Sequence, residues 1–220
     1  MSKVVQPIII ANWKMNLSVK DSLALAKKIS KLYKSLKPKQ SFDLVLSPTF
    51  LALPALAKAL VRSRIKLGAQ NVFWQASGAY TGEVSPQVLK EIGVDYVIIG
   101  HSERRQYLKE TDLMVKHKVA AALAVGLRPI VCVGETFAER QAGRKDIVVA
   151  QQIHQALSGL SLVTGQQIIV AYEPVWVIGS GQAVEHQELK HTAKVIEQTL
   201  VDIFGGQALL ENKIKLIYGG

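Results

Sequence analysis

The chain has 220 residues, of which 49% are hydrophobic and 20% charged, an ordinary globular composition with enough residues for a sizeable core. Its formal net charge of +10 is typical of a solvated basic surface and modestly favours an anionic small substrate through steering. Nucleic-acid binding would need basic residues clustered with aromatic residues. The sequence shows no such cluster, so we expect no nucleic-acid partner.

The single cysteine, Cys132, excludes a disulfide within the chain. It is compatible with a reducing compartment, so we expect a cytoplasmic location. The apolar run near the N-terminus is too short for a signal peptide. No run approaches the ~20 apolar residues of a membrane span, so we expect no membrane partner.

Strands and helices are predicted to alternate along the whole chain. The expected strands are seven short apolar runs at residues 7–11, 42–46, 65–69, 96–99, 129–133, 168–171 and 215–218. Helical spacing of apolar residues predicts six helices between them, at residues 18–33, 51–61, a short one after 85, 103–124, 137–157 and 184–204. Ser18 is the expected N-cap of the first helix, with Asp21 in its first turn.

Strict alternation of this kind indicates parallel strands covered by helices, an α/β fold. A doubly wound open sheet and a closed barrel both fit the pattern. No Gly-x-Gly-x-x-Gly follows the first strand, and no Gly-Lys-Ser/Thr phosphate loop occurs, so the common nucleotide fingerprints are absent. The chain shows no linker and no shift in composition, and we expect a single domain over residues 1–220.

The stretch at residues 168–181 combines a buried strand with a carboxylate at its end. Glu173 follows the strand and precedes Pro174, which holds it in extended backbone. An apolar segment and a glycine-rich end come next. Two interpretations remain open here: a solvated glutamate before a surface loop, or a base on a rigid strand followed by a mobile apolar lid that excludes water.

Polar side chains also follow the other predicted strands. The C-terminal ends of parallel strands converge on one face, where active sites are built. A carboxylate, an imidazole and a cation on one face are less easily explained by chance than any of them alone. The residues concerned are Asn12, Lys14, Gln70, Asn71, His101, Glu135 and Glu173.

Five motifs in order resemble those of the triosephosphate isomerase family. They are Ala11–Asn16 (ANWKMN), Gln70-Asn71 with residues 78–83 (GAYTGE), Gly100–Arg105 (GHSERR), Ala171–Trp176 (AYEPVW) and Tyr218-Gly219-Gly220. The resemblance runs from the first strand to the last residue. It implies a TIM (β/α)8 barrel, interconversion of dihydroxyacetone phosphate and D-glyceraldehyde 3-phosphate, a homodimer, and no metal or organic cofactor.

The resemblance also assigns roles. Glu173 is the expected base and His101 a neutral donor to the carbonyl oxygen; this pairing is the family's known arrangement and not a deduction from spacing. Lys14 supplies positive charge to the phosphate and the developing oxyanion. Asn12 is a polar contact beside it. Backbone amides of Gly179, Gly219 and Gly220 are expected to approach the phosphate.

Further expectations concern Glu103, Cys132 and the lid segment after Glu173. Glu103 either supports the site or is an ordinary carboxylate in the first turn of a helix, and Cys132 is expected to be core. The lid comprises Pro174, Val175, Trp176, Val177, Ile178 and Gly179. Val177 and the segment Gln182-Ala183-Val184 depart from the family pattern, and the second departure leaves the rate of lid closure open.

The loop at residues 72–85 is long and aromatic, and the resemblance implies that Thr81, Gly82 and Glu83 dock into a second subunit.

The sequence supplies seven strands and six following helices of an eight-stranded pattern, where the family runs to roughly 250 residues. We therefore expect a barrel that is incomplete at its C-terminus, with exposed strand edges and weakened phosphate binding. Two functions remain: the isomerase, or an inactive barrel fragment that at most binds a sugar phosphate.

Overall fold

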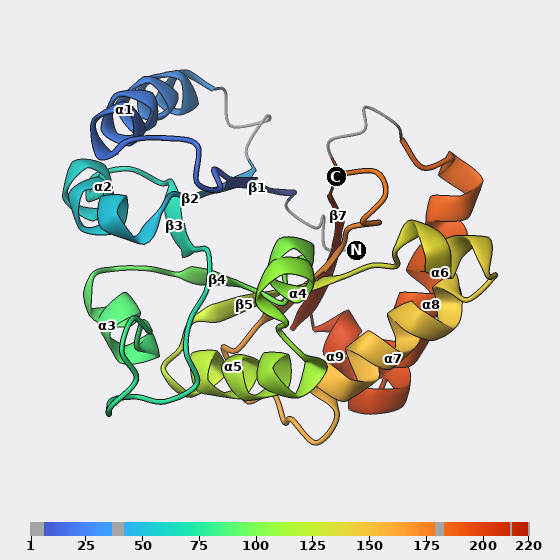
Figure 1. Cartoon of the computed structure of the whole chain (residues 1–220). Coiled ribbons are helices and arrows are strands. Elements are labelled where there is room, and N and C mark those ends of the chain that lie inside the picture. The colour runs from blue at the N-terminus through green and yellow to red at the C-terminus, as the bar shows by residue number, and fades with distance from the viewer. Residues whose placement is uncertain (1–6, 37–41, 179–182, 212, 220) are drawn as a thin grey trace. The chain divides into compact units, whose positions relative to one another are not determined.

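The computed structural model describes residues 7–36, 42–178, 183–211 and 213–219 (Figure 1). The chain divides into two compact units, residues 1–97 and 98–220. Each unit is described by itself below. A single domain over the whole chain stays a prediction.

The first unit is built on parallel strands that pair in the order of the sequence. They are β1 (Ile8–Asn12), β2 (Asp43–Ser47), β3 (Lys66–Ala69) and the first half of β4 (Tyr96–Ile99). The register places Asn12 opposite Ser47 and Gly68 opposite Tyr96. β2 and β3 are almost entirely buried.

Helices connect these strands as expected. α1 (Val19–Ser35) begins where the sequence predicts, because the side chain of Ser18 accepts a hydrogen bond from the backbone N–H of Asp21. The second helix starts with a single 3-10 turn, η2 (Phe50–Ala52), before α2 (Leu53–Leu60). Figure 1 shows α1 and α2 side by side, and α3 (Pro86–Glu91) follows the aromatic loop.

The second unit repeats the pattern with β5 (Arg128–Val133), β6 (Ile168–Tyr172) and β7 (Ile214–Tyr218). All three are parallel, with β6 paired to β5 on one side and to β7 on the other. Every residue of β6 is buried, which explains its continuous apolar sequence. This strand leads directly to Glu173.

The helices of the second unit are more divided than the sequence suggests. They are α4 (Ser102–Leu108), α5 (Asp112–Ala124), α6 (Phe137–Gln141), α7 (Lys145–Leu157), α8 (His186–Phe204) and α9 (Gly206–Leu210). The predicted helix at 103–124 breaks because Lys109 adopts left-handed backbone, with φ of 55°. The predicted helix at 137–157 breaks at Gly143, with φ of 67°. α9 was not predicted.

All seven predicted strands are confirmed within the described residues, with ends that differ by at most one position. Strand and helix alternate along the chain, so the predicted α/β class is also confirmed. Among the helices that the structure describes, none is both long and apolar enough to cross a membrane.

A buried ionic cluster joins α4 and α5. The Glu110 carboxylate is fully buried and accepts hydrogen bonds from Lys118 Nζ at 2.6 Å and Arg104 Nε at 2.6 Å. It also accepts one from the backbone N–H of Gly100, at 3.0 Å. Burial by itself raises the pKa of Glu110, but the hydrogen bonds and charges of Lys118 and Arg104 outweigh burial and leave that pKa below its ordinary value.

We predict that Glu110→Gln lowers the free energy of unfolding by about 3 kcal/mol at neutral pH, because it removes the carboxylate charge from a buried ion pair with Lys118 and Arg104. The folded-state pKa of Glu110 is lowered, so its contribution is fully present above the ordinary carboxyl pKa. That contribution is lost as pH falls through the folded-state pKa. The difference in the free energy of unfolding between wild type and variant should therefore become smaller at acidic pH.

Urea unfolding of both proteins at neutral pH and at successively lower pH measures this difference. Glu197→Gln is the matched control, because Glu197 lies on the exposed face of α8. A loss of stability no greater than that of the control, or one that does not change with pH, contradicts the prediction.

Candidate active site

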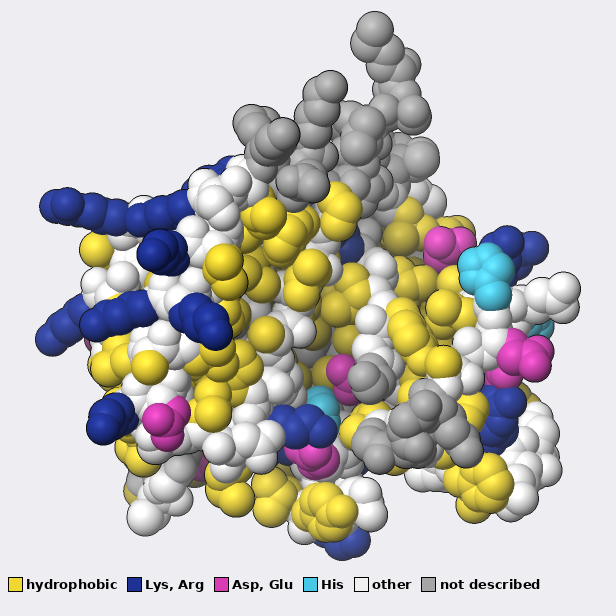
Figure 2. Space-filling model, turned by 90° about the horizontal axis from the view of Figure 1, so that it is seen from above, with side chains coloured by type: hydrophobic (Ala, Val, Ile, Leu, Met, Phe, Trp, Pro, Cys, Tyr) yellow, Lys and Arg dark blue, Asp and Glu magenta, His cyan; other side chains and the backbone are white. Residues whose placement is uncertain are grey.

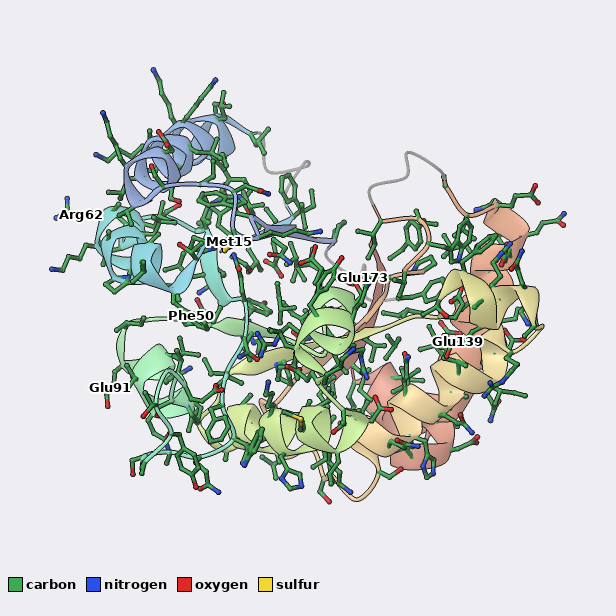
Figure 3. The ribbon with its side chains drawn as sticks, viewed as in Figure 1. Met15, Phe50, Arg62, Glu91, Glu139 and Glu173 are labelled. Carbon is green, nitrogen blue, oxygen red and sulfur yellow. The ribbon has the colours of Figure 1, made fainter. Side chains whose placement is uncertain are left out.

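Glu173 stands where β6 ends, at the carboxyl end of the strand (Figure 3). Its backbone N–H donates to the carbonyl of Val133 at 2.8 Å, which extends the pairing between β5 and β6 by one residue. The side chain is only 19% exposed. The carboxylate is therefore held on rigid backbone and largely withdrawn from water.

His101 lies against this carboxylate, with its Nε2 atom 3.6 Å from Glu173 Oε2. It is the N-cap of α4, and its Nδ1 atom accepts a hydrogen bond from the backbone N–H of Glu103 at 3.2 Å. An amide N–H can donate only to a ring nitrogen that carries no proton. The geometry is therefore that of a neutral imidazole with its proton on Nε2, the atom that faces Glu173.

Two glycines allow the backbone to pass close to Glu173. A Cβ atom built on Gly134 would lie 2.0 Å from the carbonyl oxygen of Glu173. A Cβ atom on Gly219 would lie 3.2 Å from the Cγ and Oε1 atoms of the same residue. The backbone N–H of Gly219 donates to the carbonyl of Tyr172 at 3.0 Å. Gly134 thus packs against the backbone of Glu173, and Gly219 packs against its side chain.

Cys132 contacts the same carboxylate from below. Burial raises the pKa of its thiol well above the ordinary value, and the adjacent Glu173 charge raises it further. The thiol stays protonated and donates to the carboxylate. Together with Gly100, Val133 and Val175, these two residues line a small pocket. The sequence placed Cys132 in the core, and the residue is indeed buried.

In the first unit, Asn12 and Lys14 follow β1 in an unusual backbone conformation. Lys14 has φ of 51°, a left-handed value that few residues other than glycine adopt. Its N–H donates to Asn12 Oδ1 at 3.0 Å, and its carbonyl accepts from Gln70 Nε2 at 2.8 Å. Gln70 also binds the carbonyl of Ser47, at 2.9 Å. A strained backbone conformation that several hydrogen bonds hold in place is typical of functional positions.

The segment after Glu173 is anchored by Glu135. This fully buried carboxylate accepts a hydrogen bond from Trp176 Nε1 at 2.8 Å and one from the Tyr172 hydroxyl at 3.2 Å. Burial, followed by the charge of Glu135, raises the pKa of Tyr172 above its ordinary value. Its hydroxyl therefore remains a donor.

Arg140 covers the face of the Trp176 indole, with its guanidinium carbon 4.4 Å from the ring centroid. The same guanidinium is held by both carboxylate oxygens of Glu188 on α8. Lys145 Nζ reaches Glu188 as well, at 3.3 Å. The described part of the expected lid, residues 174–178, is thus tied to α6 and α8 through one tryptophan.

The loop at residues 72–85 folds on itself. Phe73 is buried and stacks on Trp74 at 4.0 Å and against Tyr80 at 4.7 Å between ring centroids. Residues 75–83 are exposed, including Thr81, Gly82 and Glu83. The loop therefore presents a structured tip, which is the arrangement expected of a docking element.

The structure brings His101, Glu173 and Gly219 together within the second unit, as the sequence predicts for a site at the strand ends. Glu103 lies beside them, with Oε2 3.6 Å from His101 Nδ1. Gly179, Gly220 and Gln182 lie outside the described residues. Asn12 and Lys14 belong to the other unit.

The family model described as Triosephosphate isomerase matches residues 7–220. A triosephosphate isomerase of Caldanaerobacter subterraneus subsp. tengcongensis is 43% identical over 215 residues, and one of Clostridium botulinum (strain Langeland) is 42% identical over 213. These alignments cover 98% and 97% of this chain and 84% of each relative.

The chain belongs to the triosephosphate isomerase family. The family resemblance and the TIM-barrel class inferred from the sequence are thereby confirmed. The described residues contain seven parallel strands of the barrel pattern.

Sequence reasoning missed two parts of this site. Gly134 directly follows the predicted strand at 129–133, and nothing in its local sequence shows that a Cβ atom there would lie 2.0 Å from another backbone. Glu135 was noted as a polar strand-end residue without a role. Its partners, Tyr172 and Trp176, are about 40 positions away, and only the pairing of β5 with β6 brings them near.

Over the described part of the chain, no group of three or more His, Cys, Asp or Glu side chains has the arrangement needed to hold a metal ion.

We predict that Gly134→Ala lowers isomerase turnover by about a hundredfold while the protein still folds. The added methyl group must displace the backbone at Glu173, and a carboxylate misplaced by ~1 Å can cost that much. Steady-state kinetics and a thermal melt measure the two quantities. Gly206→Ala is the control, because a Cβ atom there meets nothing within 4 Å. Equal turnover in the two variants refutes the prediction.

Proposed function

We propose that this chain interconverts dihydroxyacetone phosphate and D-glyceraldehyde 3-phosphate through an enediolate, with Glu173 as the base and His101 as the electrophile. Membership of the triosephosphate isomerase family supports the reaction. The residue roles are supported by the geometry around Glu173.

The observation that carries the proposal is the pairing of His101 with Glu173. A carboxylate that is largely shielded from water faces an imidazole whose Nδ1 is occupied by a backbone donor, which leaves Nε2–H to donate. An aldose–ketose isomerisation needs one group that takes and returns a proton and another that donates to the carbonyl oxygen. These two side chains supply both functions.

The reaction then needs two proton transfers at carbon and one between the two oxygens, which His101 relays by giving a proton to one oxygen and taking one from the other. Glu173 removes a proton from the carbon next to the substrate carbonyl, while His101 Nε2–H stabilises the negative charge that develops on the oxygen. The protonated carboxyl of Glu173 returns the proton to the neighbouring carbon. The family resemblance assigns the phosphate and oxyanion charge to Lys14 and a polar contact to Asn12. It assigns backbone donors to Gly179, Gly219 and Gly220.

We predict that Glu173→Asp lowers kcat by about a hundredfold and changes KM little, because it withdraws the carboxylate by about one methylene without removing any substrate contact. A dehydrogenase-coupled assay of glyceraldehyde 3-phosphate formation measures both constants. Glu197→Asp, on the exposed face of α8, is the control. Near-wild-type kcat in Glu173→Asp removes this residue from the role of base.

We further propose a homodimer that docks through the loop at residues 72–85. The loop has an exposed tip at 75–83 that is stiffened by the aromatic cluster at Phe73. A rigid, exposed segment binds at a lower entropic cost than a flexible one. Thr81, Gly82 and Glu83 lie in this tip.

Accordingly, Thr81→Asp should weaken the dimer, because a charge would be buried in the interface without a partner. Sedimentation velocity over a range of concentrations measures the effect. Thr164→Asp places the same charge in an exposed turn of the second unit and should leave sedimentation unchanged. A wild-type protein that sediments as a monomer at micromolar concentration would falsify the dimer.

We also propose a cytoplasmic location. The chain has one cysteine, Cys132, which is a buried free thiol. A thiol of this kind is compatible with a reducing compartment.

A further inference from the structure

The net charge of the protein is distributed unevenly between its two units. Residues 1–97 contain fourteen Lys and Arg against five Asp and Glu, a formal charge of +9. Residues 98–220 contain thirteen against twelve, a formal charge of +1. Almost all of the +10 therefore belongs to the first unit. An asymmetry of this size points to an anionic partner for that unit.

Much of this charge lies on one face of α1. The helix buries Ser22, Ala26 and Tyr33 and turns the opposite side to solvent. That side carries an exposed stripe of lysines at helical spacing, Lys20, Lys27, Lys28, Lys31 and Lys34. Asp21 is the single acidic residue of the helix, and it is hydrogen-bonded to Ser18.

The basic surface of α1 continues over α2 and the turn that follows α2. α1 and α2 pack together, with a hydrogen bond of 3.4 Å between the hydroxyls of Ser30 and Ser63. Lys58 and Arg62 are exposed. Figure 3 shows Arg62 pointing away from its helix into solvent. In Figure 2, Lys and Arg side chains stand out from this part of the surface with hydrophobic side chains between them.

Across the described residues, Lys27, Lys28, Lys31 and Lys34 enter no ion pair. In the sequence from 22 to 82, Asp43 is the single acidic residue. Like charges three and four positions apart destabilise a helix. Repulsion among these lysines thus costs free energy in the isolated chain. An anionic surface that covers the face would offset that cost.

The side chains among the lysines indicate which anionic surface fits. Leu32 is 60% exposed and lies one turn from Lys28, and Leu51 and Val61 are 83% and 79% exposed. The aromatic residues of these helices, Tyr33 and Phe50, are buried or half-buried, so no ring is available for base stacking. Lysines on a helix with exposed aliphatic side chains suit a bilayer with anionic headgroups.

We propose that the face formed by α1 and α2 adsorbs to membrane surfaces that carry anionic lipid headgroups. The contact is peripheral and electrostatic, so it requires no membrane-spanning helix and weakens as salt screens the charges. This interaction revises the expectation of no membrane partner. That expectation rested on the absence of an apolar span and did not consider a surface contact.

The test compares two double variants that remove the same charge from exposed helix faces. Lys27→Gln with Lys31→Gln neutralises two lysines of α1, and Lys190→Gln with Lys194→Gln neutralises two lysines of α8 with the same spacing. Binding of the whole chain is measured by co-sedimentation with vesicles of phosphatidylcholine alone and with added phosphatidylglycerol, at low and physiological salt. Isomerase turnover and thermal melting confirm that both variants fold.

We expect the wild type to bind only the phosphatidylglycerol vesicles. Each lysine near an anionic surface adds about fivefold to the affinity, so the α1 variant should bind about 25-fold more weakly and the α8 variant almost normally. Equal losses in the two variants would show that binding follows net charge and would overturn the proposal. No binding to anionic vesicles at low salt would also overturn it, as would tighter binding to an RNA homopolymer at the same salt.

Discussion

The close passage of two backbones at Gly134 and Glu173 determines where the carboxylate of this site can stand. The gap between them admits a hydrogen atom and nothing larger. Because Glu173 also continues the pairing between β5 and β6 through its own N–H, its Cα position is fixed by the sheet and not by the loop that follows. The remaining groups of the second unit's site are arranged around that fixed point.

Backbone groups set much of the electrostatics of the site. The N–H of Glu103 determines which nitrogen of His101 carries the proton. Gly100, the residue before His101, donates its own N–H to the buried Glu110 carboxylate. In the first unit, the left-handed conformation of Lys14 is maintained by the side-chain amides of Asn12, at the end of the same strand, and of Gln70, after β3. Groups held in this way need little reorganisation when charge develops on a bound molecule.

The sequence predicted most of the fold because its signals are local. Ser18 and Asp21 mark the start of α1, and the apolar runs mark all seven strands. The break between α4 and α5 was not predicted, since Lys109 takes a conformation that usually marks a glycine. α9 begins at Gly206, directly after Gly205, and two consecutive glycines indicate a helix end more readily than a new helix.

The candidate site was predicted from strand ends and from the family motifs, so residues that carry chemistry were easier to find than residues that hold them. His101 and Glu173 belong to recognisable motifs. Gly134, Glu135 and Glu188 act on residues 39 to 48 positions away in the sequence. Their roles depend on which strands and helices become neighbours, and no local pattern encodes that.

The environment of Trp176 has a consequence for motion. Its indole N–H is bound by Glu135 and its face is covered by Arg140, which Glu188 holds in place. Lys145 in turn binds Glu188. If the ring rotates, it must give up the hydrogen bond and the cation contact in the same step. The residue therefore behaves as a latch with discrete positions, because packed groups of this kind are bistable and do not deform continuously.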